Sequence, residues 1–188
     1  MPNYSIFILS GGKSTRMKED KSLMLFEGKP MIQHLIDRFK KLNSEIVIIS
    51  NKNSHLNFGL TVIKDNYKNC GPIGGIEAGL AYSQTNNNIF ITCDNPFIEC
   101  QLINYISTNP ESSDIVFSNY NQLHPFPGLY TKDIHLKIKT LISEGFRKMT
   151  DLKMHFNVYE MDCKHFNKNN FINFNYPEDI KKWHENNT

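Results

Sequence analysis

The sequence lacks the patterns that mark membrane, secreted and nucleic-acid-binding proteins. No apolar run approaches the ~20 residues that a spanning helix needs, and the N-terminus shows no signal-peptide pattern. The net charge of +2 over 188 residues is too small to indicate a nucleic-acid or membrane partner. We therefore expect a cytoplasmic protein that contacts neither nucleic acid nor a membrane.

Metal-binding and nucleophile patterns are missing as well. The four cysteines include no C-x-x-C pair, and the seven histidines include no H-x-x-x-H or H-E-x-x-H pair. Zinc and iron–sulfur sites are therefore not expected, and the cysteines are interpreted as reduced thiols. The sequence shows no Ser-His-Asp or Cys-His arrangement for nucleophilic catalysis.

A glycine-rich stretch at 10–22, SGGKSTRMKEDKS, follows an apolar run at 4–9. A nucleotide-hydrolysing P-loop would need a glycine where Phe7 stands. The dinucleotide pattern G-x-G-x-x-G fails too, because Lys13 follows the glycine pair. The stretch therefore matches neither of these two nucleotide-binding loops.

Short apolar runs alternate with amphipathic stretches along the chain. This order is typical of an α/β protein whose mostly parallel sheet is covered by helices. We expect strands at 4–9, 46–49, 60–63, 89–92 and 114–118, and helices at 30–41, 72–83 and 101–107. Later we expect a turn-rich segment at 124–128, a helix at 132–143, short strands at 155–160 and 171–174, and a closing helix from Pro177. The length fits a single domain at 1–188.

Three polar clusters follow predicted strands. They are the start of the glycine-rich stretch, Asp65, and the run from Cys93 to Pro96 (CDNP). Ligands of open parallel sheets gather beyond the carboxyl ends of the strands. We therefore expect these clusters to converge on one edge of the sheet.

Lys13, Arg16 and Lys21 add positive charge to the glycine pair, and Arg16 is one of only three arginines. Adjacent glycines let the backbone offer N–H groups to phosphate oxygens, and arginine can clamp a phosphate through two nitrogens. The alternative is an ordinary turn with solvated lysines. The glycines alone leave both interpretations open, whereas Arg16 and Lys21 favour phosphate binding.

Asp94 ends a strongly apolar predicted strand, where an unpaired carboxylate is costly. Mg²⁺ shared with substrate phosphates would supply its partner. The alternative is an aspartate that caps the turn before Pro96. Opposite a cationic glycine loop, the metal interpretation is favoured.

Two further clusters are less specific. The stretch Cys70–Gly75 (CGPIGG) can let a base or ribose lie against the backbone, or can simply start a helix. Asn173 and Asn175 can bind polar edges of a ligand, or form a turn and helix N-cap. Together the clusters predict attack by a substrate phosphate on a nucleotide α-phosphate, a reaction that needs alignment, cations and a metal.

The stretch Leu9–Lys21 (LSGGKSTRMKEDK) resembles the L-A-G-G-x-S-x-R-M-G-x-D-K signature of nucleotidyltransferases, most closely that of the MobA family, the molybdenum cofactor guanylyltransferases. Further similar stretches cover nearly all of the chain: GKPM at 28–31, VIKD at 62–65, GPIGG at 71–75, CDNP at 93–96, HP at 124–125, GLY at 128–130 and NFNYPED at 173–179. The resemblance implies a three-layer, Rossmann-like nucleotidyltransferase fold. It implies a nucleotide-binding part at about 1–118 and an acceptor-substrate part at about 119–188.

The resemblance also implies roles for individual residues. It implies catalysis by Lys21, Arg16 and Asp94, with Mg²⁺ on Asp94, and pterin binding by Asn173 and Asn175. Nucleotide contacts are implied for Leu9, Ser10, Gly11, Gly12, Lys21, Asn51, Asp65, Gly71, Gly74 and Asp94. The implied reaction joins GMP from GTP to molybdenum-molybdopterin and releases pyrophosphate, and molybdoenzymes or their chaperones are implied as candidate partners.

Three positions depart from the family pattern. Ser10 replaces an alanine, Lys18 stands where glycine is usual, and an asparagine of the family falls on Ile49, so that Asn51 is expected to replace it. The alternatives are a CTP-dependent molybdopterin cytidylyltransferase, a sugar-phosphate nucleotidyltransferase, and a noncatalytic nucleotide-binding adaptor in cofactor delivery.

Overall fold

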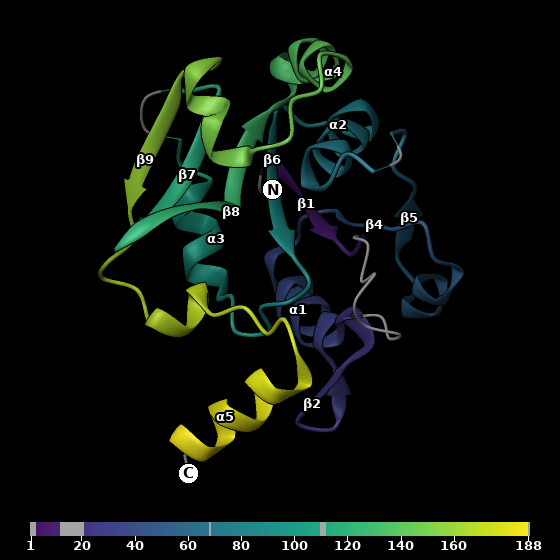
Figure 1. The fold of residues 1–188 in the computed structure, drawn as a ribbon, viewed down its shortest axis with the longest axis vertical. Coiled ribbons are helices and arrows are strands. Elements are labelled where there is room, and N and C mark those ends of the chain that lie inside the picture. Colours follow the sequence, from purple (N-terminus) through teal and green to yellow (C-terminus); the bar gives the residue numbers. More distant parts are fainter. Residues whose placement is uncertain (1–2, 12–20, 68, 110–111, 188) are drawn as a thin grey trace.

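The structure is a computed structural model that describes residues 3–11, 21–67, 69–109 and 112–187 (Figure 1). A seven-stranded sheet with the order β5-β4-β1-β6-β8-β7-β9 forms its centre. Among these strands β8 alone runs antiparallel to its neighbours, which confirms the mostly parallel sheet. The strands are β1 (Tyr4–Leu9), β4 (Ile46–Ile49), β5 (Thr61–Ile63), β6 (Asn87–Thr92), β7 (Ile115–Tyr120), β8 (Gln122–Thr131) and β9 (Val158–Asp162).

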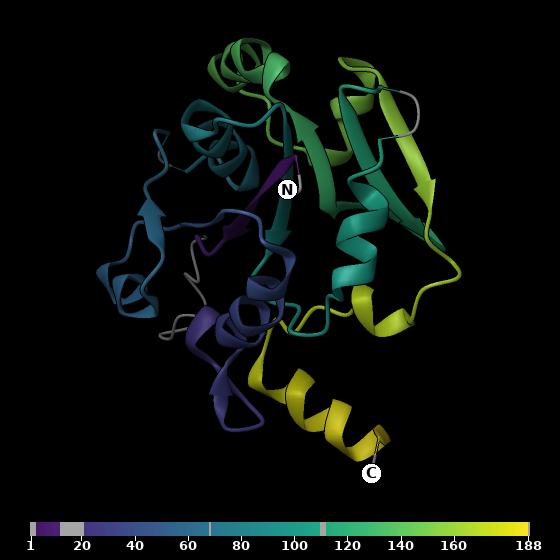
Figure 2. The same ribbon diagram turned by 180° about the vertical axis from the view of Figure 1, so that it is seen from behind.

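Helices cover both faces of the sheet, because successive residues of each central strand point to opposite sides. In β1, Ile6 and Ile8 pack with helices α1 (Met31–Phe39) and α3 (Cys100–Ile106). Phe7 packs on the other face with α2 (Pro72–Tyr82) and α4 (His135–Ser143). Figure 2 shows α1 and α3 in front of the sheet. These three layers confirm the predicted α/β architecture.

A smaller apolar cluster lies beyond the carboxyl ends of the strands. The hairpin of β2 (Leu25–Phe26) and β3 (Lys29–Pro30) contributes Phe26 to it. Helix α5 (Pro177–Asn187) projects from the body of the protein and contributes Trp183, whose ring lies 5.3 Å from that of Phe26 (Figure 1). This cluster fixes the C-terminal segment near the end of β6.

The carboxyl ends of the four neighbouring parallel strands β5, β4, β1 and β6 are level with one another. Leu9 pairs with Ile49 of β4 and with Thr92 of β6, and Ile49 pairs in turn with Ile63 of β5. The residues that follow these four positions therefore lie along one edge. This alignment confirms the prediction that the polar clusters after the strands converge.

The sequence interpretation was wrong at two places. The predicted turn at 124–128 lies inside β8, since the pairing with β7 shifts between Phe117 and Ser118 and leaves 125–127 unpaired. Prolines, which lack an N–H, are tolerated at such an irregularity. The predicted strand at 171–174 is instead a 3₁₀ helix (Lys168–Phe171) followed by extended chain that joins no sheet.

The other predicted elements occur with small shifts in their bounds. The strand predicted at 155–160, for example, is β9 at Val158–Asp162. The sheet crosses the expected boundary near residue 118, because β8 pairs with β6 and β7. The assignment of one domain with a nucleotide-binding and an acceptor part stays a prediction.

Candidate active site

A cleft opens at the carboxyl ends of β1, β4 and β6. Its inner part has a volume of about 220 Å³, and an adjoining outer part of about 630 Å³ shares Ser10, Gly11, Lys52 and Asp65 with it. Among the described residues the inner part is lined by Leu9, Ser10, Gly11, Lys21, Ile49, Lys52, Asp65, Gly71, Pro72, Gly75, Thr92, Cys93 and Asp94. The structure therefore brings together most of the described residues that the sequence proposed for a nucleotide.

Asp94 lies on the floor of this cleft, two residues after the end of β6. Its Oδ1 atom is buried and has no hydrogen-bond partner among the described residues. Burial raises the pKa of this carboxyl, while a hydrogen bond from the Thr92 side chain and the charge of Lys21 act to lower it. A buried carboxylate oxygen without a partner is costly, so the site suits a bound cation.

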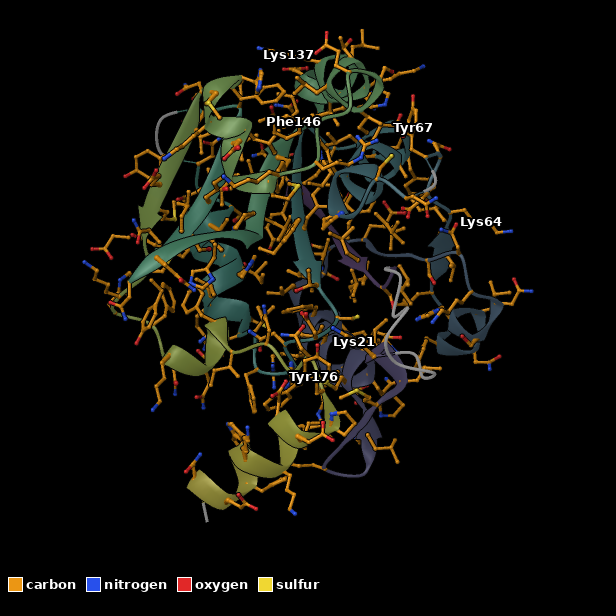
Figure 3. All side chains as sticks on the ribbon, viewed as in Figure 1. Lys21, Lys64, Tyr67, Lys137, Phe146 and Tyr176 are labelled. Carbon is orange, nitrogen blue, oxygen red and sulfur yellow. The ribbon has the colours of Figure 1, made fainter. Side chains whose placement is uncertain are left out.

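Lys21 begins a short 3₁₀ helix (Lys21–Leu23) and lines the same cleft as Asp94. Its Nζ donates a hydrogen bond to Asn175 Oδ1 at 2.9 Å and lies 5.9 Å from the centre of the Tyr176 ring. Figure 3 shows Lys21 and Tyr176 together, beyond the ends of β1 and β6. A cation and a carboxylate thus face one cleft, as the sequence predicts.

The segment that carries Asn175 is hydrogen-bonded to the loop after β6. The Phe174 N–H donates to the Asp94 carbonyl at 2.8 Å. The Asn95 amide donates to the Asn170 carbonyl at 2.6 Å, and the Glu99 N–H donates to Asn170 Oδ1 at 2.8 Å. The side chain of Asn173 is exposed and is not among the described lining residues of the cleft. The two predicted asparagines therefore differ, and only Asn175 contacts a cleft residue in the described structure.

Asp65 stands in the second position after β5, and its Oδ2 atom would lie 3.6 Å from a Cβ added to Gly11. Burial raises the pKa of its carboxyl, Glu77 adds to the rise, and a hydrogen bond from Asn51 opposes it. The Asn51 Nδ2 atom is 3.5 Å from Asp65 Oδ2, which is a long contact. Asn51 also lines the outer part of the cleft. That Asn51 takes the position of the family's asparagine stays a prediction.

The glycines at the start of α2 do not all face the cleft. Gly71 lines it and has a φ of +68°, a conformation that glycine adopts more easily than other residues. Gly74 faces Cys70 and Tyr67, where an added Cβ would lie 3.3 Å from each, and Gly75 lines the cleft in its place. Helix periodicity explains the exchange, since neighbouring helical positions point in different directions.

Sequence reasoning missed Lys52, which lines both parts of the cleft three residues after β4. Its position just past a buried strand was a usable signal, but lysine is abundant in the chain. Gly12 and Arg16, two predicted site residues, and the unusual Lys18 lie outside the described residues. Their roles stay predictions.

Comparison with known proteins identifies the family. The model of the MobA-like NTP transferase domain matches residues 6–157, which include most of β1, the residues that line the cleft and most of the sheet. The chain belongs to the MobA-like NTP transferase family. Since the fold and the site geometry agree with this assignment, the chain is a nucleotidyltransferase.

Similar proteins extend the comparison beyond the matched domain. The "Probable molybdenum cofactor guanylyltransferase" of Flavobacterium johnsoniae is 36% identical over 154 residues, covering 81% of each chain. The molybdenum cofactor guanylyltransferase of Vibrio parahaemolyticus is 33% identical over 182 residues, covering 94% of this chain and 92% of its own. The crystal structure of molybdopterin-guanine dinucleotide biosynthesis protein A from Archaeoglobus fulgidus superposes with a TM-score of 0.83 at 20% identity, covering 96% of this chain and 97% of that one, and it shows a shared fold.

Two kinds of feature are absent from the residues that the structure describes. These residues contain no helix that is long and apolar enough to cross a membrane. They also contain no group of three or more histidine, cysteine or acidic side chains that could hold a metal ion.

Proposed function

We propose that this MobA-like enzyme transfers GMP from GTP to molybdenum-molybdopterin, forming the guanine dinucleotide cofactor and pyrophosphate. The observation that carries the proposal is the placement of Lys21 and Asp94 in one cleft at the ends of the parallel strands. The names of the relatives in Flavobacterium and Vibrio support guanine as the base and molybdenum cofactor as the acceptor.

The reaction is a displacement at the α-phosphorus of GTP. An oxygen of the acceptor's terminal phosphate forms a new bond to that phosphorus, and the bond to the bridging oxygen of the β-phosphate breaks. Negative charge then accumulates on the departing pyrophosphate. Since the nucleophile belongs to the acceptor, the protein has to align the two substrates and stabilise this charge.

Lys21 is the residue proposed to stabilise that charge. Its ammonium group is held at the cleft by Asn175, so it is oriented before a nucleotide binds. The backbone of Leu9 to Gly11 would lie along the phosphates, because the glycine has no side chain to block close approach. Asp65, Asn51 and Gly71 would contact the nucleoside in the wider outer part of the cleft.

Mg²⁺ is proposed as the cofactor, with Asp94 as its protein ligand. The unpartnered Oδ1 of this buried carboxylate fits such an ion, and a hard oxygen ligand fits Mg²⁺. When bound, the ion would neutralise phosphate charge. Asp94 itself would orient the nucleotide relative to Lys21.

The acceptor is proposed to bind along the C-terminal segment. Asn175 and the exposed Asn173 lie on a segment fastened to the Asp94 loop through Phe174, so a ligand bound there would be adjacent to the phosphates. Molybdoenzymes or their chaperones are proposed to receive the product. A cytoplasmic location is also proposed, and the four free cysteines support it.

One experiment tests the proposal. The protein is incubated with Mg²⁺, molybdenum-molybdopterin and each nucleoside triphosphate separately, and the products are identified by mass spectrometry. A guanine dinucleotide formed only with GTP is the expected result. A product with CTP alone would indicate a cytidylyltransferase, and a product formed only on a sugar phosphate would indicate a different acceptor. Nucleotide binding without any product would indicate an adaptor.

A further inference from the structure

A buried histidine lies behind the cleft. His55 is 0% exposed and belongs to a 3₁₀ helix (Asn53–Phe58) between β4 and β5. Its Nε2 atom is 2.6 Å from Ser10 Oγ and 2.8 Å from Ser22 Oγ. Its Nδ1 atom is 2.9 Å from Ser50 Oγ. One imidazole ring therefore joins three serine hydroxyls from three distant segments.

Each of these serines stands beside a part of the cleft. Ser10 follows the last residue of β1 and precedes Gly11, and Ser50 follows the last residue of β4. Ser22 is the neighbour of Lys21. All three serines are buried, so each hydroxyl needs a partner inside the protein. The ring thus connects the phosphate-facing backbone, the end of β4 and the Lys21 segment.

We propose that His55 is a positioning residue that fixes the position of Lys21 relative to the Ser10–Gly11 backbone for phosphate binding and transfer. The inference rests on the proposed role of the cleft in GMP transfer. His55 acts through the serines, because its ring is buried and the described residues that line the cleft do not include it. A planar ring fixes the contacts of Nε2 with Ser10 and Ser22 and the contact of Nδ1 with Ser50 at the same time. A flexible side chain would do this less well.

The two ring nitrogens can be removed separately. In His55→Asn the amide can occupy the Nδ1 position, which keeps the contact of residue 55 with Ser50 and removes its contacts with Ser10 and Ser22. In His55→Gln the amide can reach the Nε2 position, which keeps the contacts of residue 55 with Ser10 and Ser22 and removes its contact with Ser50. Both variants carry a neutral amide in a buried place, so they are a matched pair for stability.

We expect the two variants to differ in activity. His55→Asn should lower kcat for pyrophosphate release about tenfold, because Lys21 loses its orientation in the transition state. It should also weaken GTP binding about threefold or more through the Ser10–Gly11 backbone. His55→Gln should stay within about twofold of the wild type on both measures. Isothermal titration with GTP and Mg²⁺ supplies the affinity and the fraction of competent protein, and kcat is divided by that fraction.

A control separates positioning from general loss of stability. Asn88 is a buried residue at the opposite end of β6, where its side chain contacts Ser83, Thr85 and Tyr130. Asn88→Ala should lower the melting temperature and leave kcat per competent site unchanged. If His55→Asn behaves like Asn88→Ala, His55 is merely structural and the proposal is overturned.

Equal activities of His55→Asn and His55→Gln at equal competent fractions would also overturn it. If neither variant folds, Ser22→Ala tests the same connection, with a kcat reduced about threefold or more as the expected result and an unchanged kcat as the contrary one. A wild type without activity would instead contradict the proposed reaction. The GTP affinities of the two variants would still decide the role of His55.

Discussion

Lys21 donates a hydrogen bond to Asn175 at 2.9 Å across 154 positions of sequence. The bond joins the segment before the β2–β3 hairpin to the segment before α5. It places a cation proposed for phosphate transfer next to a residue proposed for acceptor binding. The proposed nucleotide part and the proposed acceptor part of the chain would therefore meet at this pair.

Lys21→Ala is expected to lower kcat for pyrophosphate release about 100-fold, because the charge of the departing pyrophosphate loses its stabilising cation. The melting temperature should change by less than about 2 °C, since a solvent-exposed hydrogen bond contributes little. Steady-state kinetics and thermal melts give both quantities. Lys29→Ala, which removes an exposed lysine paired with Asp37, is the control and should keep full activity. A large stability loss in Lys21→Ala would indicate a structural role instead.

Asp94→Asn is expected to abolish the Mg²⁺-dependent part of GTP binding and to lower kcat at least about 100-fold. The amide keeps the shape of the carboxylate, and the backbone carbonyl of residue 94 still accepts the hydrogen bond from the Phe174 N–H. The fold should therefore remain intact. Titration calorimetry with GTP, with and without Mg²⁺, measures the metal dependence. Wild-type rates of pyrophosphate release in this variant would show that Asp94 is not the metal ligand.

The ends of the strands, and with them most of the site, could be predicted from the sequence. Buried parallel strands appear as continuous apolar runs, so the positions just after Leu9, Ile63 and Thr92 were identifiable, and the register of the sheet brought them together. Lys21 and Asp94 were predicted to share a cleft, and this is confirmed.

The connections between distant side chains could not be predicted. His55 and Asn170 are polar residues in segments of ordinary composition, and their burial depends on packing between segments far apart in the sequence. Pro125 and Pro127 indicated a turn, whereas the shift in pairing that tolerates them depends on the neighbouring strand β7. Local patterns contain no information about such partners.

Asp65→Asn is expected to raise the melting temperature of the ligand-free protein by about 2 °C or more at mildly alkaline pH. Burial raises the folded-state pKa of Asp65 above the value in the unfolded chain, so the folded protein binds more protons between the two pKa values. Stability therefore falls as the pH rises through this window, and the ionised carboxylate destabilises the fold above it.

Thermal melts of the wild type and Asp65→Asn over a series of pH values check this sign. The difference in melting temperature between the two proteins should shrink as the pH falls and Asp65 becomes protonated. Asp37→Asn is the control, and its effect on the melting temperature should have the opposite sign, because a hydrogen bond from Gln33 lowers the pKa of Asp37. A pH-independent difference at Asp65 would contradict the argument.

Asn170→Ala is expected to raise the KM for the molybdopterin acceptor more than the KM for GTP. The substitution leaves the Glu99 N–H without its side-chain partner inside the protein, which destabilises the fold by about 1–3 kcal/mol. The Asn95 contact is to the Asn170 backbone and should persist. The segment that leads to Phe174 and Asn175 is then held less firmly, so the acceptor side of the cleft changes first. Kinetics with each substrate varied in turn measure the two KM values. Lys168→Ala, at an exposed neighbouring position, is the control. Equal changes in both KM values would indicate that the segment does not serve the acceptor.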